Sequence, residues 1–472
     1  MSSPDAPSST AVEDSPSQPL QGWARLRELL ADRVYPVNAP PTQRRDRALR
    51  YLVGGAVFLV ASVATLLRLP VSRLDTLWAE DGTAFLQTAL HSPATWTIQQ
   101  PHAGYLQVFP RTVAELVTLL PVSAAGVAFS VVAALVVGLT AWTVWEFGAA
   151  HLPSPWLRGL LATAVVVIPA GGLEAVDNAA NSHWFLMYAA FWSLVARRPG
   201  AGRQVLPVVI VVFAALSDPL SIVLAPLVLG RLLVLRGMRD RWVAIGYVVA
   251  IAAQLHAVFS VERPTGQTAT TREIAFGYAL RVVTSSLTGN GGARRTVDAA
   301  GSTGVWLVAG LGLVCLLAGW LLAGRLRLFL AASAVASVAF FAVECVFALG
   351  GQYPPAGDLE ADLTVGSRYT IVPALLLLTA FGVAAQALVP RVTGRWAKAG
   401  AVVVAIPLVL CAAYDYRPES GPLRTEMPSW SSEVEQIEEQ CTASPTATPD
   451  PVPIAPVETW TVALLCSDVT DG

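Results

Sequence analysis

The stretch RRDRALRYLVGGAVFLVASVATLLRLPVSRLDTLWAEDG, residues 44–82, decides the fold class of this chain. Arginines precede an apolar segment at 51–68 that is long enough to cross a bilayer, and a more polar loop follows it. Two adjacent carboxylates, Glu80 and Asp81, lie in that loop. This order predicts a chain that enters the membrane from its basic side and carries the two acids on the other side.

The composition of the whole chain agrees with that interpretation. Of its 472 residues 54% are hydrophobic and only 14% are charged, and the mean hydropathy is +0.55. Soluble domains carry about 25% charged residues. We therefore expect an all-α polytopic membrane protein and exclude a large soluble core.

Apolar segments near 20 residues long, some of them shorter, recur along the chain. They predict about eleven transmembrane helices, near 51–68, 123–147, 156–170, 183–196, 204–216, 219–235, 242–260, 303–323, 328–349, 369–388 and 399–415. The region 156–235 allows other divisions.

Arginine is unevenly distributed between the two sides of these spans. The turns predicted to be cytoplasmic are all basic and contain Arg158, Arg197, Arg198, Arg203, Arg236, Arg239, Arg241, Arg325, Arg327, Arg391, Arg395 and Lys398. The short turns on the other side are acidic or mixed. The positive-inside rule therefore predicts a multi-pass protein of the cytoplasmic membrane, with the N-terminus inside and the C-terminus outside.

One long outside loop, 261–302, carries several arginines, which long loops tolerate. Its segment 273–287 has apolar residues at roughly helical spacing, and this predicts a helix on the outer membrane face. Its arginines either meet anionic lipid head groups or simply lie at the interface.

Three regions follow from these patterns. Residues 1–43 are predicted to be a cytoplasmic, mostly disordered segment without a cleavable signal peptide, containing a short amphipathic helix over Trp23 to Val34. Residues 44–415 form the transmembrane domain, and 416–472 form a small extracytoplasmic tail. Because Cys441 and Cys466 both lie in that polar tail, we expect a disulfide between them.

The pair Glu80 and Asp81 is the leading candidate for catalysis. Adjacent side chains cannot face the same way on a helix or strand, so one acid is expected to face a substrate. In a partly dry site such a carboxylate can act as a general base. The other acid either binds a cation or caps a helix that starts at Asp81-Gly82-Thr83.

A second group of polar residues lies in the outside turn before 183–196. Asn178, Asn181 and His183 next to an aromatic ring suit the hydroxyls and apolar face of a sugar. The alternative is ordinary decoration of the membrane interface. Asp218, in Ser217-Asp218-Pro219, is either a substrate ligand or a turn residue.

Cationic and aromatic residues supply the remaining candidates. Arg368 and Tyr369 open the span at 369–388 on the side that positive charge avoids, and Arg111 precedes another span. A guanidinium fork suits a phosphate, although both arginines can instead snorkel to the interface. His102 and Tyr105 lie in the same loop as Glu80, where His102 is an acid/base candidate or a structural histidine.

Several other classes of function have no support in the sequence. There is no phosphate-binding glycine loop, no dinucleotide fingerprint and no Ser/His/Asp constellation, and nothing indicates a nucleic-acid partner. Asp81 is also a candidate ligand for a divalent cation, Mg²⁺ or Mn²⁺. A single pair of acids makes only a weak metal site, so the sequence does not decide whether a metal binds.

The segment Trp78 to Gly82, with Gly104-Tyr105 and Pro110-Arg111, resembles a bacterial branch of the GT-C superfamily of membrane glycosyltransferases. The resemblance covers about residues 44–415. It implies an inverting transfer of a sugar from a polyprenyl-phosphate donor to a glycan, glycolipid or glycoprotein acceptor among membrane lipids, on the extracytoplasmic face. It further implies that Glu80 or Asp81 acts as base or metal ligand and that Arg368 holds the lipid phosphate.

Two other functions remain as alternatives. A transporter or flippase of lipid-linked sugars would use charged residues within the spans, where Glu344 and His256 stand out. A related polysaccharide polymerase would share the geometry of the transferase and differ in its donor.

Overall fold

The structure is a computed structural model that describes residues 22–38, 43–172, 174–198, 200–261, 269–347, 363, 366–388, 413–416, 424, 427–445, 448–456 and 459–470. Its regular structure is nearly all helical, as the composition predicts. Most of the span predicted at 399–415 lies outside the described residues.

Short helical turns connect the longer helices throughout the chain. The first part of the chain forms α1 (Gly22–Arg33), α2 (Arg44–Leu66), η1 (Val71–Arg73), η2 (Asp81–Leu86), α3 (Gln87–His91), α4 (Ala94–Thr97), β1 (Pro101–His102), β2 (Tyr105–Leu106), α5 (Val108–Val117), η3 (Val122–Ala124), α6 (Ala125–Phe147), η4 (Gly148–Ala150), α7 (Pro155–Val167) and η5 (Pro169–Gly172). The middle part forms α8 (Ser182–Val195), η6 (Ala201–Gln204), α9 (Val205–Ser217), η7 (Pro219–Leu224), α10 (Ala225–Val234), α11 (Met238–Ser260), α12 (Thr271–Gly277), η8 (Tyr278–Thr284) and α13 (Ser285–Leu322). The last part forms η9 (Gly324–Leu326), α14 (Arg327–Phe347), η10 (Ser367–Thr370), α15 (Ile371–Leu388), α18 (Trp430–Ala443), β3 (Val452–Pro453), β4 (Thr461–Val462) and α19 (Cys466–Thr470).

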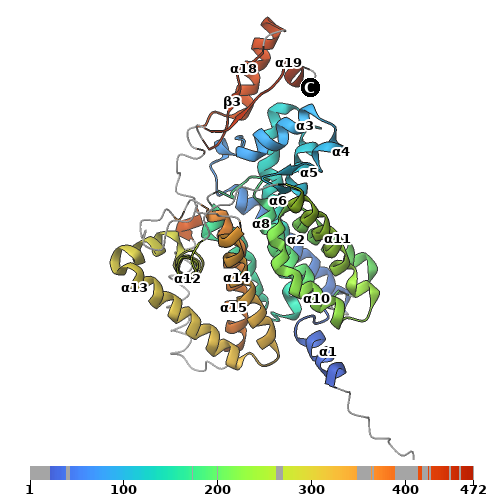
Figure 1. The fold of residues 1–472 in the computed structure, drawn as a ribbon, viewed down its shortest axis with the longest axis vertical. Helices are drawn as coiled ribbons and strands as arrows, with labels where there is room; N and C mark the ends of the chain where they lie inside the picture. Colours follow the sequence, from blue (N-terminus) through green and yellow to red (C-terminus); the bar gives the residue numbers. More distant parts are fainter. Residues whose placement is uncertain are drawn as a thin grey trace, which may run out of the picture.

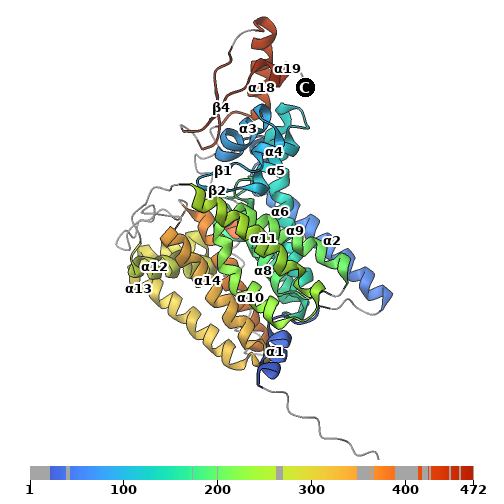
Figure 2. The same ribbon diagram turned by 45° about the vertical axis from the view of Figure 1, so that its right-hand side comes forward.

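The molecule is elongated, and three groups of elements are arranged along its long axis (Figures 1 and 2). The long helices form a body in the middle, with α1 at one end. The short elements α3, α4, α5, β1 and β2 lie at the other end of the body, and α18 and α19 extend beyond them. The two ends of the helical body are therefore built from different parts of the chain.

Seven helical segments within the described residues are long and apolar enough to cross a membrane, so the chain is a membrane protein. They are Arg44–Leu66, Val122–Ala150, Pro155–Gly172, Met238–Ser260, Thr271–Leu322, Gly324–Phe347 and Ser367–Leu388. Each overlaps a predicted span. The predicted number of about eleven is not confirmed, because three further predicted spans form helices too short to qualify.

The three short helices, α8, α9 and α10, follow one another in sequence. Every residue of α8 is buried, and it contacts α6, α9 and α15. A helix that is apolar on all sides belongs in the interior of a bundle. Asp218 separates α9 from η7 and accepts a hydrogen bond from the backbone N–H of Leu220, which starts the new helical turn.

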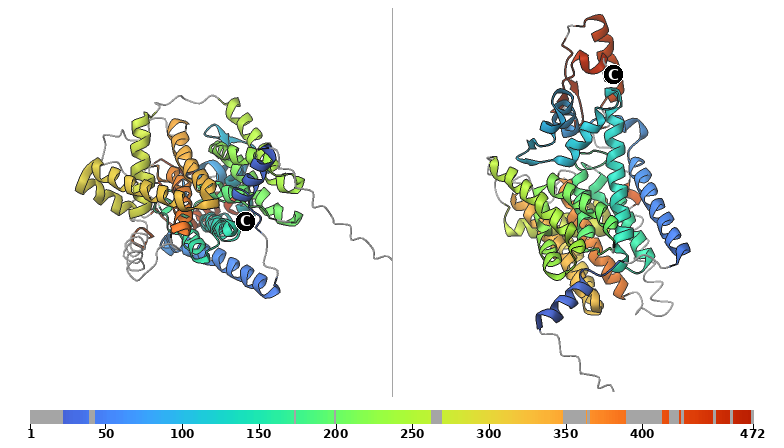
Figure 3. Two further views of the ribbon diagram at one scale, coloured as in Figure 1. Left: turned by 90° about the horizontal axis from the view of Figure 1, so that it is seen from below. Right: turned by 90° about the vertical axis from the view of Figure 1, so that its right-hand side faces the viewer.

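Two glycines let long helices approach closely. A Cβ at Gly138 of α6 would overlap Ser62 and the carbonyl of Phe58 on α2, and one at Gly319 of α13 would overlap Ala384 on α15. Small residues at contact points are typical of helix pairs in membranes. Outside this contact α2 lies at the edge of the body (Figure 3).

The predicted helix at 273–287 is present, and much of it is buried against other parts of the chain. It runs through α12, η8 and the start of α13, and the residues of η8 from Ala279 to Thr284 are buried. Phe276 and Leu280 pack against Val305, so the apolar face is covered by the chain itself. The helix predicted here is confirmed, and its position on the outer membrane face stays a prediction.

The C-terminal tail shares one hydrophobic core with the first loop. Tail residues Trp430, Ile454 and Val462 pack with Trp78 and Phe85. Within the tail, β3 pairs antiparallel with β4, and Cys441 forms a disulfide with Cys466 at a Cα–Cα distance of 5.4 Å. The tail is too short for a core of its own, and it obtains one by docking on the loop.

Polar contacts fix this docking. Asp75 in the first loop accepts hydrogen bonds from the hydroxyls of Ser429 and Ser431 and from the backbone N–H of Ser431, at the start of α18. The indole N–H of Trp430 donates to the carbonyl of Val122 at 2.7 Å. An acid at the beginning of a helix also interacts favourably with the helix dipole.

We expect Trp430→Ala to loosen the tail from the first loop. Trp430 is 2% exposed, and truncating a buried tryptophan costs about 3–5 kcal/mol. Hydrogen exchange over 427–443 should become much faster. The matched control is Trp96→Ala, because Trp96 is 51% exposed and lies at the same end of the molecule. Equal exchange in the two variants would contradict the shared core.

Candidate functional site

The segment Trp78 to Gly82 forms a tight turn held by the tail. Trp78 bridges Ala455 in parallel, with hydrogen bonds from Ala79 N to Ala455 O at 2.5 Å and from Ala455 N to the carbonyl of Leu77 at 3.1 Å. Ala79 has a φ of +22°, a conformation that L residues rarely adopt. The carbonyl of Trp78 then accepts the N–H of Asp81 at 2.7 Å. The turn sends the two acids in different directions.

Asp81 is directed into the protein and is 1% exposed. Its carboxylate oxygens accept hydrogen bonds from the backbone N–H groups of Ala179 and Ala180 at 2.9 and 2.7 Å. It does not cap its own helix, because both oxygens are used by the distant turn at 174–181. Asp81 therefore joins the first loop to that turn and is not presented to a substrate.

Burial raises the pKa of Asp81 to about 7, even though the hydrogen bonds from Ala179 and Ala180 oppose the shift. The charge of Glu80 adds to the increase, and that of Arg424 reduces it. A carboxyl in this range changes protonation near neutral pH.

Glu80 is half-buried and faces a different group of side chains. Its charge acts on His102, Tyr105 and Arg368. Among the described residues its carboxylate has no hydrogen bond or ion pair. Glu80 is therefore the acid of the pair that is left available for chemistry.

His102 and Tyr105 are positioned by a hairpin. They pair across β1 and β2, and the connecting Ala103 and Gly104 have φ of +51° and +82°, as a two-residue hairpin turn requires. The side-chain amide of Gln254 on α11 makes two hydrogen bonds with the backbone of Leu106. Its oxygen accepts the N–H of Leu106, and its NH₂ group donates to the carbonyl of Leu106. The hairpin thus carries both side chains toward Glu80.

The environment of these two residues is dry. Burial lowers the pKa of His102, with the charge of Glu80 opposing and that of Arg111 adding to the effect. The pKa of Tyr105 lies well above its usual range, mainly because of burial and then because of Asp218 and Tyr369. Both side chains are therefore uncharged hydrogen-bonding groups at neutral pH.

His183 and Asp218 form a buried pair. The Nε2 atom of His183 lies 3.1 Å from Oδ2 of Asp218, and its Nδ1 atom lies 2.7 Å from the carbonyl of Ala180. A carbonyl only accepts, so Nδ1 donates to Ala180. The charge of Asp218 also acts on Tyr105, so the pair lies beside that residue.

Arg368 and Tyr369 lie on the same side as this pair. The guanidinium of Arg368 is 4.9 Å from the ring of Tyr369 and 3.5 Å from Oε1 of Glu174. Glu174 also accepts the backbone N–H groups of Gly366 and Arg368, at 3.1 and 3.3 Å. The side chain of Arg368 is 27% exposed, so part of its fork is open to a ligand.

Arg111 is buried beneath the loop, with its guanidinium 5.2 Å from the ring of Phe85. Its Nε and Nη1 atoms have no hydrogen-bond partner among the described residues. Burial lowers its pKa, and the charge of Glu115 opposes that shift. Arg111 places a positive charge next to His102. Unlike Arg368, which is partly exposed, Arg111 is buried.

Asn178 and Asn181, predicted to bind a sugar, serve the turn instead. The amide of Asn178 donates to the carbonyl of Glu174 at 2.7 Å, and its oxygen accepts both the backbone N–H and the side-chain N–H of Asn181, each at 2.9 Å. The amide of Asn181 also donates to the carbonyl of Glu174. These bonds shape the turn whose amides bind Asp81.

Two further residues complete the region: Asp177, from the same polar turn as Asn178, and Arg424, which the sequence did not single out. Asp177 is buried, and its pKa is raised to about 7 by burial against the opposing charges of Arg424 and Arg68. Arg424 donates to the carbonyls of Val176 and Asp177. Because these contacts span more than 200 residues of sequence, no local pattern could have found them.

Glu344 belongs to this region as well. It is buried near the end of α14, both carboxyl oxygens lack a partner among the described residues, and its charge acts with that of Asp218. It therefore lies on the side of Asp218, next to the group formed by Tyr105 and Tyr369. Glu344 therefore lies near the end of a spanning helix and not near its middle.

The structure thus brings Glu80, His102, Tyr105, Arg368 and Tyr369 together, with His183 and Asp218 behind them. Asp81, Asn178 and Asn181 hold the scaffold. No group of three or more potential metal-ligating side chains occurs in the described part of the chain. Such an arrangement combines a free carboxylate, a cation and neutral hydroxyls, which is what proton removal from a hydroxyl beside an anion needs.

No protein-family model, no curated protein and no solved structure matches this chain.

We expect the stability of this end of the molecule to depend on pH. The raised pKa values of Asp81 and Asp177 mean that the folded state holds protons more tightly than the unfolded chain. This stabilisation is fully present below the ordinary aspartate pKa of 3.8 and is lost as the pH rises through about 7. Thermal unfolding should therefore shift to lower temperature between pH 5 and pH 8.

Asp177→Asn should make this shift smaller, since it removes one of the two titrating groups. The control is Asp298→Asn, which removes an exposed carboxylate and should keep the full shift. A melting temperature in the unaltered chain that is constant or rises from pH 5 to pH 8 would contradict the assignment.

Proposed function

We propose that this protein is a membrane glycosyltransferase of the GT-C type that uses a polyprenyl-phosphate sugar as donor. The observation that carries the proposal is the placement of Glu80. Its carboxylate is half-buried, has no hydrogen bond among the described residues, and acts electrostatically on His102, Tyr105 and Arg368.

In the proposed reaction Glu80 takes the proton from an acceptor hydroxyl. The hydroxyl oxygen forms the new bond to the anomeric carbon, and the bond from that carbon to the phosphate oxygen breaks with inversion. The leaving phosphate keeps the electron pair, and the open part of the Arg368 fork binds it. No nucleotide is needed, because a lipid phosphate is already a good leaving group.

The other residues position these two. Tyr105 and Tyr369 offer hydroxyls and aromatic faces to a sugar, and the pair of His183 and Asp218 lies behind them. Glu174 supports Arg368 by binding the backbone that carries it. Asp81 has the role of holding the loop, and the divalent cation at Asp81 stays a prediction.

The proposal places the acid loop on the extracytoplasmic face of the cytoplasmic membrane. It is supported by the separation of charge along the molecule. Glu80 and Asp81 come just before α3, which lies at the end next to the tail, whereas Arg197 and Arg239 line a pocket with Val37 beside α1 at the other end. A polysaccharide polymerase would use the same residues with a different donor.

We expect Glu80→Gln to lower sugar transfer by about 10²–10⁴-fold, which is the usual contribution of a general base. Membranes that contain the chain would be supplied with a polyprenyl-phosphate sugar, and labelled product would be measured. The variant should keep its normal amount and melting temperature, since Glu80 supports no other described side chain by a hydrogen bond.

Two control variants make this test specific. Glu435→Gln, an exposed acid in the tail at the same end, should leave transfer unchanged. Asp81→Asn should lose stability by about 1–3 kcal/mol, because its NH₂ group would face a backbone N–H. Normal transfer in Glu80→Gln would remove the catalytic assignment.

A transporter of lipid-linked sugars is the second candidate, and Glu344 favours it. A buried carboxyl with no partner among the described residues, in a spanning helix, is a functional candidate by default. Under the transferase proposal, Glu344→Gln should retain transfer within a few-fold, because Glu344 lies behind Asp218. Loss of lipid-sugar movement across vesicles in Glu344→Gln, with Glu80→Gln unaffected, would favour the transporter.

A further inference from the structure

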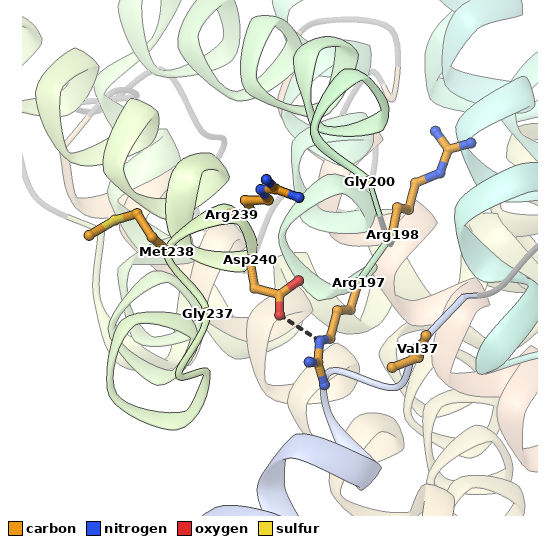
Figure 4. Close-up of a pocket in the computed structure, with 8 residues that line it drawn as sticks. All are labelled: Val37, Arg197, Arg198, Gly200, Gly237, Met238, Arg239 and Asp240. Carbon is orange, nitrogen blue, oxygen red and sulfur yellow. Dashed lines mark hydrogen bonds and ion pairs between the residues drawn. The ribbon is translucent and has the colours of Figure 1, made fainter.

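A pocket of about 490 Å³ lies in the part of the molecule where α1 docks, far from the acid loop (Figure 4). Three segments build its walls: the chain after α1, the loop after α8, and the start of α11. The lining side chains that matter here are Val37, Arg197, Arg198, Met238, Arg239 and Asp240. The pocket therefore holds three guanidinium groups and one carboxylate.

The segment after α1 is firmly attached at this pocket. Val37 bridges Arg197, and the N–H of Asn38 donates to the carbonyl of Arg197 at 2.7 Å. The hydroxyl of Tyr35 donates to the carbonyl of Leu227 at 2.6 Å, and Tyr35 packs against Val234. The pocket is thus a built feature with walls held by backbone contacts.

Its positive charges are only partly neutralised. Nε of Arg197 lies 2.9 Å from Oδ2 of Asp240, and Figure 4 shows this ion pair inside the pocket. Arg239 is exposed, and the guanidinium groups of Arg239 and Arg198 have no hydrogen bond or ion pair with a described residue. The lining of the pocket therefore contains three arginines and one carboxylate.

Arg198 connects this pocket with a second basic crevice. The residue is 9% exposed, its guanidinium lies 4.8 Å from the ring of Phe147, and Figure 4 shows it directed away from Asp240. Burial lowers its pKa, with the charges of Arg203 and Arg50 adding to the effect.

Two groups act in the opposite direction on Arg198, namely Glu146 and Tyr51. The carboxylate of Glu146 is already bound by Nε of Arg50 at 3.0 Å, and the hydroxyl of Tyr51 accepts a hydrogen bond from Arg203. The acids of this region are therefore committed, and the arginines are in excess.

A phosphate group has the chemistry that satisfies such a pocket. Guanidinium forks bind phosphate oxygens in a bidentate manner, and the pocket includes Gly237, which precedes α11 and supplies no side-chain cap to it. The positive end of the helix dipole therefore adds to the charge of Arg197 and Arg239.

The rim of the pocket is apolar, and this favours a phosphate compound that also carries an apolar chain. Val37 and Met238, which line the pocket, are exposed, and on α1 the side chains of Trp23 and Leu26 are exposed as well. Aromatic and aliphatic side chains beside arginines are typical of the level where lipid head groups meet acyl chains. A ligand with a phosphate and an acyl chain matches both parts.

We propose that this pocket binds the phosphate head group of an anionic membrane phospholipid, with Arg239 and Arg197 on the phosphate and Met238 beside the acyl chain. The site lies at the opposite end of the molecule from Glu80 and does not depend on the proposed reaction. Basic pockets between helices are known to recognise anionic lipid head groups.

The test uses the purified full chain in mild detergent and native mass spectrometry. Phosphatidylglycerol and phosphatidylcholine would be titrated separately, and bound lipid would be counted against concentration. We expect phosphatidylglycerol to be retained in preference to phosphatidylcholine. Arg239→Gln should weaken its binding roughly tenfold or more, which corresponds to the loss of one charge-assisted hydrogen bond.

The matched control is Arg236→Gln, since Arg236 is exposed, close in sequence and outside the pocket lining. It should leave binding unchanged. Equal retention of the two lipids, or an equal effect of the two variants, would overturn the proposal. Arg198→Gln gives an independent check, because loss of the buried charge should also weaken phosphatidylglycerol binding.

A further arm uses inorganic phosphate to distinguish a lipid from a soluble anion. Under the proposal, phosphate at millimolar concentration does not displace phosphatidylglycerol. If phosphate alone binds as tightly and displaces the lipid, the pocket is a site for a soluble phosphate compound and the assignment to a phospholipid fails.

Discussion

The bond between the Asp81 carboxylate and the backbone amides of Ala179 and Ala180 joins two parts of the chain that are otherwise separated by α5, α6 and α7. Burying a carboxylate costs free energy unless its oxygens receive hydrogen bonds, and both oxygens of Asp81 receive them. Asn178 and Asn181 shape the turn that supplies these amides. With Asp81 fixed inward, the tight turn at Trp78 leaves Glu80 facing the opposite group of side chains.

The C-terminal tail covers the acid loop from its other side. Ala455 of the tail forms an isolated β-bridge with Trp78, and Arg424 binds the carbonyls of Val176 and Asp177 next to the Asp81 turn. Gly82 is required at this contact, since a Cβ there would overlap Ile454 and Val462. The loop is therefore enclosed by the turn on one side and by the tail on the other.

The two ends of the helical body differ in charge and in the kind of ligand they suit. At the end next to the tail, one free carboxylate lies among an arginine, a histidine and tyrosines. Where α1 docks, far from that loop, arginines exceed carboxylates around a pocket with an apolar rim. The first arrangement suits proton removal beside an anion, and the second suits binding of a lipid phosphate, so the two regions suit different ligands.

The sequence by itself determined the class of fold, because apolar segments of spanning length can only be satisfied as helices in a bilayer. It also indicated the helix at α1, the break at Asp218-Pro219 and the candidate acids. It did not decide between Glu80 and Asp81, since adjacent residues differ only in which distant groups they meet. The groups that meet the loop lie about a hundred or more residues away along the chain, and only tertiary packing brings them there. They are the amides of Ala179 and Ala180, the backbone of Ala455 and the guanidinium of Arg424. Hydrogen bonds and burial between remote segments leave no periodic trace in the sequence, and for that reason the roles of these residues were decided by the folded structure alone.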